Sequence, residues 1–212
     1  MLYRFIVTLT SVVFLFVLNA NAFSKPSLFS IYNIETPFVI TQPIIAANLI
    51  EDSSDELLAI GIDDKGNTWL AIYIFNQASK YYQLHTKHII PNAYFAYDIT
   101  DFVKDDKNKL RSLYFLSKDE VVMFQPSLST NSSAFNNHFV LKQKVSSMYL
   151  VNSADFIKAK DFIKDLNQDG LDDIYLPHFE QMNLWLSQPS GQLYSQFLPL
   201  DSFVEHDSSK IT

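Results

Sequence analysis

Apolar residues in this chain fall in short runs with the character of β-strands, and polar turns separate the runs. No stretch combines a 3.6-residue period with capping residues at both ends, so the pattern predicts no long helix. The pattern therefore predicts an all-β fold. The expected strands lie at residues 57–60, 68–75, 81–90, 113–116, 120–124, 139–145, 174–176, 183–186 and 193–200.

Two segments repeat in the same order along the chain. Asp101-Phe-Val-Lys-Asp105 recurs as Asp161-Phe-Ile-Lys-Asp165, and a polar turn and two apolar runs follow each copy. Both copies then reach a Gln-Pro-Ser tripeptide, at 125–127 and at 188–190. A shared order of this kind indicates an internal repeat of 50 to 60 residues.

A third and weaker copy lies upstream. Residues 48–56 precede the run 57–60, and Asp63-Asp-Lys-Gly-Asn67 predicts a hairpin turn in which Gly66 takes positive φ. Several strands per unit favour the blades of a β-propeller over a solenoid. The approximate blades are 28–90, 91–150 and 151–212.

Three blades are fewer than the 4 that a closed propeller usually needs. The chain would therefore be incomplete, completed by partner chains, or an open array. A fragment of a longer propeller is the favoured interpretation.

Residues 1–22 have the pattern of a secretory signal peptide. Arg4 supplies the positive n-region, residues 5–18 form the apolar h-region, and Ala20-Asn-Ala22 offers the small residues that a signal peptidase reads. Cleavage would leave residues 23–212 in a secreted or periplasmic protein. The apolar run is short for a membrane anchor, so no membrane span is expected after cleavage.

Charge and cysteine content narrow the classes of partner and of site. A net charge of −7 at pH 7 disfavours nucleic acid and anionic lipid as partners, because an acidic chain does not neutralise the charge of phosphates or lipid head groups. The sequence contains no cysteine, which excludes disulfides, thiolate metal sites and thiol nucleophiles. An acidic chain of this kind suits a cation-binding surface.

Residues 165–173, Asp-Leu-Asn-Gln-Asp-Gly-Leu-Asp-Asp, carry the strongest chemical signal. Oxygen-bearing side chains recur at the first, third, fifth and ninth positions. Calcium takes 6 to 8 oxygen ligands, and Gly170 permits the sharp turn that would gather them. The predicted calcium ligands are the side chains of Asp165, Asn167, Asp169 and Asp173 and the backbone carbonyl of Leu171.

Two other interpretations of this loop were weighed. An EF-hand needs a bidentate Glu at position twelve, where this chain has Leu176. A solvated Asp/Asn/Gly turn without metal is common, but so many acidic groups repel one another unless a cation or water screens them. The loop is therefore predicted to hold calcium structurally, with a Kd on the order of 10⁻⁴ to 10⁻³ M.

Residues 161–190 resemble the FG-GAP/VCBS repeat of integrin-like β-propellers, in which D-x-[DN]-x-D-G-x-x-D loops hold calcium. The resemblance is degenerate over 101–127 and faint over 48–79. It implies four-stranded blades and an extracytoplasmic setting, often with binding or adhesion roles. The two weaker copies depart from the ligand pattern, and we expect them to be turns without metal.

The remaining candidate residues indicate no catalytic set. His85 and His88 would point to opposite faces of a strand, and His138, His178 and His206 are isolated in sequence. No G-x-S-x-G, P-loop or H-E-x-x-H motif is present.

The leading hypothesis is a non-enzymatic, exported, calcium-binding β-propeller module that binds a protein or a glycan. The first alternative is the propeller portion of a secreted carbohydrate-active enzyme whose catalytic residues lie outside this chain. The second alternative is a structural spacer.

Overall fold

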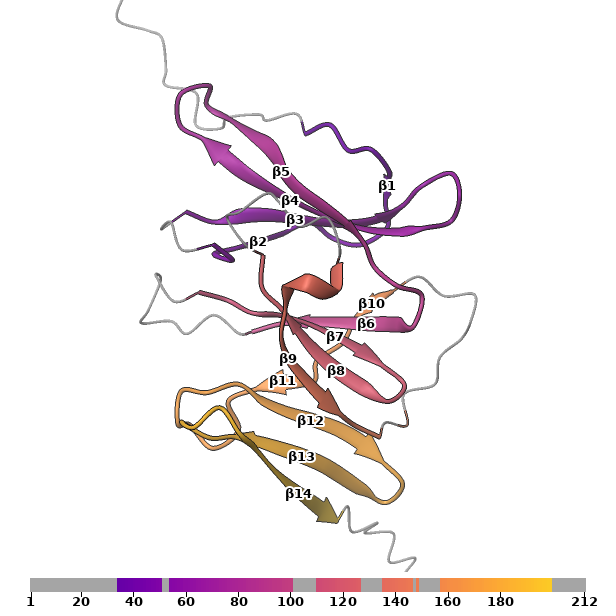
Figure 1. Ribbon diagram of the computed structural model, residues 1–212, viewed down its shortest axis with the longest axis vertical. Helices are drawn as coiled ribbons and strands as arrows, with labels where there is room; N and C mark the ends of the chain where they lie inside the picture. The colour runs from indigo at the N-terminus through magenta and orange to yellow at the C-terminus, as the bar shows by residue number, and fades with distance from the viewer. Residues whose placement is uncertain are drawn as a thin grey trace, which may run out of the picture. The chain divides into compact units, whose positions relative to one another are not determined.

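The computed structural model describes residues 34–50, 54–100, 110–126, 135–146, 148 and 157–199, all within one compact unit. The predicted signal peptide, residues 1–22, lies outside these residues. The described chain is all-β, as predicted, with strands in three mainly antiparallel sheets and a single short 3₁₀ helix, η1 (Phe135–His138). Figure 1 shows the sheets following one another in chain order.

The first sheet contains five strands, in the order β1-β3-β4-β5, with β2 also pairing to β3. Its strands are β1 (Val39–Ile40), β2 (Ile45–Ala47), β3 (Glu56–Ile62), β4 (Thr68–Asn76) and β5 (Tyr81–Ile89). The β3–β4 hairpin turns at Gly66, whose φ of 78° confirms the positive φ predicted there. Asp63 stabilises the turn, since its carboxylate accepts hydrogen bonds from the Asn67 amide at 2.9 Å and the Trp69 indole at 2.9 Å.

The second and third sheets are built on four-stranded antiparallel meanders. The second runs β6 (Tyr94–Ile99), β7 (Leu113–Ser117), β8 (Glu120–Phe124) and β9 (Phe139–Lys144), and β10 (Lys158–Ala159) adds in parallel to β6. The third runs β11 (Ile163–Lys164), β12 (Asp173–His178), β13 (Gln181–Ser187) and β14 (Leu193–Pro199). Every strand predicted from the apolar runs overlaps an observed strand. None of the three sheets closes on itself within the described residues.

Both faces of the second sheet are covered, because its strands are apolar at consecutive positions. In β7, Leu113 and Phe115 belong to a core cluster shared with the first sheet, whereas Tyr114 and Leu116 belong to a cluster shared with the third. Successive side chains of a strand point to opposite faces, so one strand contributes to two cores. All five residues of β7 are buried for this reason.

Strand register shows which residues of the three sheets are equivalent. Ala47 pairs with Glu56 in the first sheet, and Lys164 pairs with Asp173 in the third. Each pair closes the loop that joins a short edge strand, β2 or β11, to the strand that follows it in the chain. The loop 48–55 is therefore equivalent to 165–172. The faint sequence copy at 48–56 therefore matches the third sheet in register.

The loop that joins the first two strands of the second-sheet meander is longer than its counterparts in the other sheets. In the second sheet Ile99 pairs with Leu113, which leaves residues 100–112 between the two partners, five more than the eight of 165–172. The strand β6 ends at Ile99, so the strand pairing of the described residues does not reach Asp101, which the sequence comparison aligns with Asp161. Residues 101–109 lie outside the described residues.

Candidate functional site

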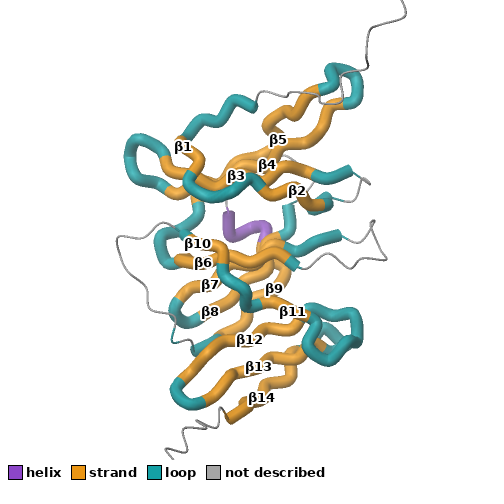
Figure 2. The backbone as a smooth tube through the Cα atoms, turned by 180° about the vertical axis from the view of Figure 1, so that it is seen from behind, coloured by secondary structure: helices purple, strands orange, loops and turns teal. Residues whose placement is uncertain are grey.

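The predicted calcium loop joins β11 to β12 in the third sheet, with the Lys164–Asp173 pair at its base. Figure 2 shows it as coil between these two strands. The prediction that strands flank this loop is confirmed. Gln168 has φ of 63° and Gly170 has φ of 85°, and these two residues reverse the chain direction.

Three of the predicted ligand side chains are linked to one another through the loop backbone. The Asp165 carboxylate accepts hydrogen bonds from the backbone amides of Asp169 at 3.1 Å and Gly170 at 2.9 Å. Asn167 Oδ1 also accepts from the Asp169 amide at 3.1 Å, and Asp169 Oδ1 accepts from the Leu171 amide at 2.9 Å. These Asx-type bonds hold the first, third and fifth side chains of the loop around its turn.

The amide group of Asn167 adds a direct side-chain contact. Its Nδ2 donates to Asp169 Oδ2 at 2.9 Å. An amide N–H carries partial positive charge and screens this carboxylate weakly. A bound cation would compete with this hydrogen bond.

Asp173 occupies a different environment from the other predicted ligands. Its side chain is fully buried, and its two oxygens accept from the backbone amides of Leu166 at 2.9 Å and Ser187 at 2.8 Å. Asp173 thereby ties the start of the loop to the end of β13. Within the described part of the chain, no three His, Cys, Asp or Glu side chains are grouped as they would be around a metal ion.

The donor set therefore fits a divalent cation in part. Asp165, Asn167 and Asp169 supply solvent-accessible oxygens of the type that calcium prefers. Both oxygens of Asp173 already accept a backbone amide, although a carboxylate oxygen has a second lone pair. The five-residue calcium set stays a prediction.

The first sheet has a counterpart of the Asp173 bond. Glu56 is 1% exposed, and its Oε2 accepts from the backbone amides of Leu49 at 2.6 Å and Ile50 at 3.0 Å. Leu49 is equivalent in register to Leu166, and Glu56 to Asp173. A buried carboxylate at the start of β3 in the first sheet and of β12 in the third thus anchors the loop before it.

The third sheet is also bonded to the second. Tyr114 donates its hydroxyl proton to Asp172 Oδ2 at 3.3 Å, and Ser187 Oγ donates to the Asp172 carbonyl. Burial raises the pKa of Tyr114 above its ordinary value, and the neighbouring Asp172 carboxylate adds to this effect. Tyr114 therefore stays protonated and able to donate.

Asp98, in β6, makes the second link between these sheets. Its Oδ2 accepts from the backbone amides of Phe162 at 2.7 Å and Ile163 at 2.8 Å, just before the predicted calcium loop. Burial raises the pKa of Asp98 to about 6, although these amide donors and that of Ile99 oppose the shift. The carboxylate is ionised at neutral pH and holds the start of the third sheet against β6.

Two histidines that are distant in sequence meet between β5 and η1. The rings of His88 and His138 lie 4.6 Å apart, edge to face, and both contact Phe124. Both residues are buried, at 1% and 7% exposure. Sequence reasoning treated His138 as isolated, since nothing in the local pattern brings these residues together.

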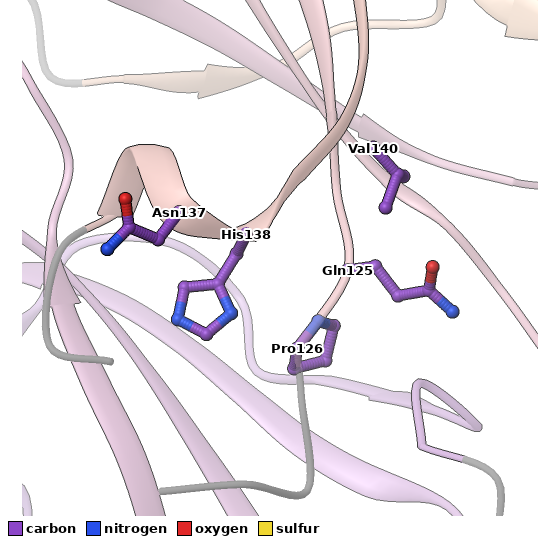
Figure 3. A pocket seen from close by; sticks show the side chains of 5 residues that line it. All are labelled: Gln125, Pro126, Asn137, His138 and Val140. Carbon is purple, nitrogen blue, oxygen red and sulfur yellow. The ribbon is translucent and has the colours of Figure 1, made fainter. Parts of the chain in front are cut away.

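A shallow pocket of about 340 Å³ opens beside His138. Figure 3 shows the imidazole of His138 near the ring of Pro126, with the amides of Asn137 and Gln125 on either side. Val140 completes the lining. The pocket offers amide and imidazole hydrogen-bonding groups beside a small apolar surface, which suits a neutral polar ligand.

The sequence matches no protein-family model, and a search of curated proteins also returns no match. Among the residues that the structure describes, no helix has the length and hydrophobicity needed to cross a bilayer.

Proposed function

We propose that this chain is an exported, non-enzymatic β-propeller module that binds calcium in the loop 165–173 and binds a protein or a glycan. The observation that carries the proposal is the bonding of Asp165, Asn167 and Asp169 within one strand-flanked loop. The sequence pattern of residues 1–22 supports export.

The sheet topology supports a propeller type. Each blade of a propeller is a four-stranded antiparallel meander that packs face to face on its neighbours. The strands β6–β9 and β11–β14 are meanders of this kind in chain order. The core clusters join the first sheet to the second and the second to the third.

In this proposal calcium supplies the positive charge that the acidic loop lacks. Asp165 and Asp169 would provide carboxylate oxygens, and Asn167 would turn its carbonyl oxygen toward the ion. The bond from Asn167 Nδ2 to Asp169 would be lost. Asp173 keeps the loop attached to β13 with or without the ion, because its bonds are to backbone amides.

Calcium is expected to raise the melting temperature, because it binds the folded loop and not the unfolded chain. At ten times Kd the gain is about 1.4 kcal/mol, or roughly 3–5 °C for a domain of this size. Asp169→Ala should lose the shift, whereas Asp64→Ala should keep it. Asp64 is a matched control, since it is an exposed aspartate in the other acidic turn. The measurement is thermal unfolding in calcium and in chelator, with calorimetric titration of both variants.

Two outcomes would contradict the calcium proposal. One is a melting curve that a chelator leaves unchanged. The other is an Asp169→Ala variant that titrates calcium like the wild type.

The binding role is tested with glycan arrays and with capture of proteins from the extracytoplasmic fraction. We expect retention of a glycan or protein that depends on the His138 pocket and is lost in Asn137→Ala. Asn137 is exposed at the pocket wall. Gln143→Ala, which removes a half-buried amide on β9 away from the pocket lining, is the control. If nothing is retained with or without calcium, the chain is a structural spacer.

A further inference from the structure

The strand β14 forms one edge of the third sheet and is the most exposed of the described strands that have five or more residues. Among the described residues it pairs with β13 alone, and six of its seven residues are exposed. Four large apolar side chains in and beside it are more than half exposed. They are Phe179 at 70%, Phe197 at 67%, Tyr194 at 59% and Leu198 at 55%.

The last strands of the first and second sheets carry the charges that protect sheet edges, whereas β14 does not. Natural edge strands use lysine to prevent pairing with another chain. The outer strand β5 contains Lys87, and β9 contains Lys142 and Lys144. The seven residues of β14, Leu-Tyr-Ser-Gln-Phe-Leu-Pro, include no charged side chain.

We propose that β14 pairs with β14 of a second copy of this chain, in antiparallel orientation about a two-fold axis at Gln196. An exposed, uncharged and apolar edge is a template for an added strand. A two-fold contact uses the same surface on both copies, so that surface must be complementary to itself. The two third sheets would form one continuous sheet across the axis.

The side chains of β14 satisfy this requirement. Full antiparallel overlap places Tyr194 opposite Leu198, Ser195 opposite Phe197, and the two Gln196 residues opposite each other. Aromatic–aliphatic pairs stabilise neighbouring strands, and opposed amides can hydrogen-bond. Pro199 lies at the strand end, where its missing N–H removes no central bond.

Charge also favours this strand as the contact. The chain has a net charge of −7, so two copies repel each other over most of their surfaces. A β14 pair brings no charged side chain of either strand together. A β9 pair would instead bring lysines of both copies into one contact, since this strand holds Lys142 and Lys144.

The contact is small, so the dimer should be weak. Stable complexes typically bury about 1,600 Å², and one pair of seven-residue edges buries less than that. We expect a Kd on the order of micromolar, in the range of weak association.

Sedimentation velocity over a concentration series tests the proposal with the full chain. Wild type should pass from monomer to dimer as its concentration rises. Gln196→Lys should stay monomeric, because the two-fold axis would place two positively charged lysines directly opposite each other. Val140→Lys is the matched control and should dimerise normally, since Val140 is 56% exposed on β9. A mixture of Gln196→Lys and Gln196→Glu should recover a heterodimer.

Three results would overturn the proposal. The first is a wild type that stays monomeric at every concentration. This result counts against the proposal even if hydrogen exchange shows that other parts of the chain cover the β14 amides. The second is a dimer that survives Gln196→Lys. The third is a lysine–glutamate mixture that stays monomeric. Each result is independent of calcium binding.

Discussion

Asp173→Ala is expected to destabilise the chain by about 3 kcal/mol, even when no calcium is present. The substitution leaves the backbone amides of Leu166 and Ser187 without their acceptors in a buried site. An unsatisfied buried donor costs about 1–3 kcal/mol. The loss should appear as a fall in melting temperature of roughly 6–12 °C in the presence of chelator.

Asp173→Asn distinguishes this anchoring role from a ligand role. An asparagine presents an NH₂ group to one of the two amide donors, so it should also destabilise the chelated protein. Asp169→Ala, in the exposed part of the same loop, is the control and should change metal-free stability much less. If all three variants melt like wild type in chelator, Asp173 does not anchor the loop.

Phe115→Ala is expected to cost about 4 kcal/mol, because it removes a fully buried ring from the core between the first and second sheets. Phe115 packs edge to face on Phe135 at 5.1 Å, Phe124 at 6.0 Å and Tyr94 at 6.1 Å between ring centroids. Truncation leaves a cavity that these rings fill only in part. Chemical denaturation measures the loss as a lower midpoint.

Phe179→Ala provides the matched control for Phe115→Ala. Phe179 lies in the β12–β13 turn and is 70% exposed, so its truncation should change the free energy of unfolding by less than about 0.5 kcal/mol. Equal effects of the two substitutions would mean that the ring cluster around Phe115 contributes little to the fold.

The two carboxylates Glu56 and Asp173 occupy matching places in the first and third sheets. Their loops have the same length and the same closing pair in the sheet, yet 48–56 is the faintest sequence copy. The side chains differ in length, but each accepts a hydrogen bond from the backbone amide of the second residue after the short edge strand, Leu49 or Leu166. This equivalence depends on hydrogen bonds to backbone groups. Such bonds require little similarity between the residue types of the two loops.

Of the two more similar segments, 161–165 contains β11, whereas 101–105 lies outside the described residues. Ile163 and Lys164 are paired within β11, whereas β6 has ended before Asp101. The internal repeat over 101–127 stays a prediction. Strand pairing fixes the register, because it satisfies the backbone groups of the whole strand.

The apolar runs and the polar turns between them determined the all-β class, the positions of nine strands and the strand-flanked setting of residues 165–173. These features are local, because each follows from the side-chain period and the turn chemistry of a few residues. Only the tertiary structure brought His88 to His138 and set Asp173 apart from the exposed loop carboxylates. Both depend on contacts between segments distant in sequence, whose free energy no local pattern encodes.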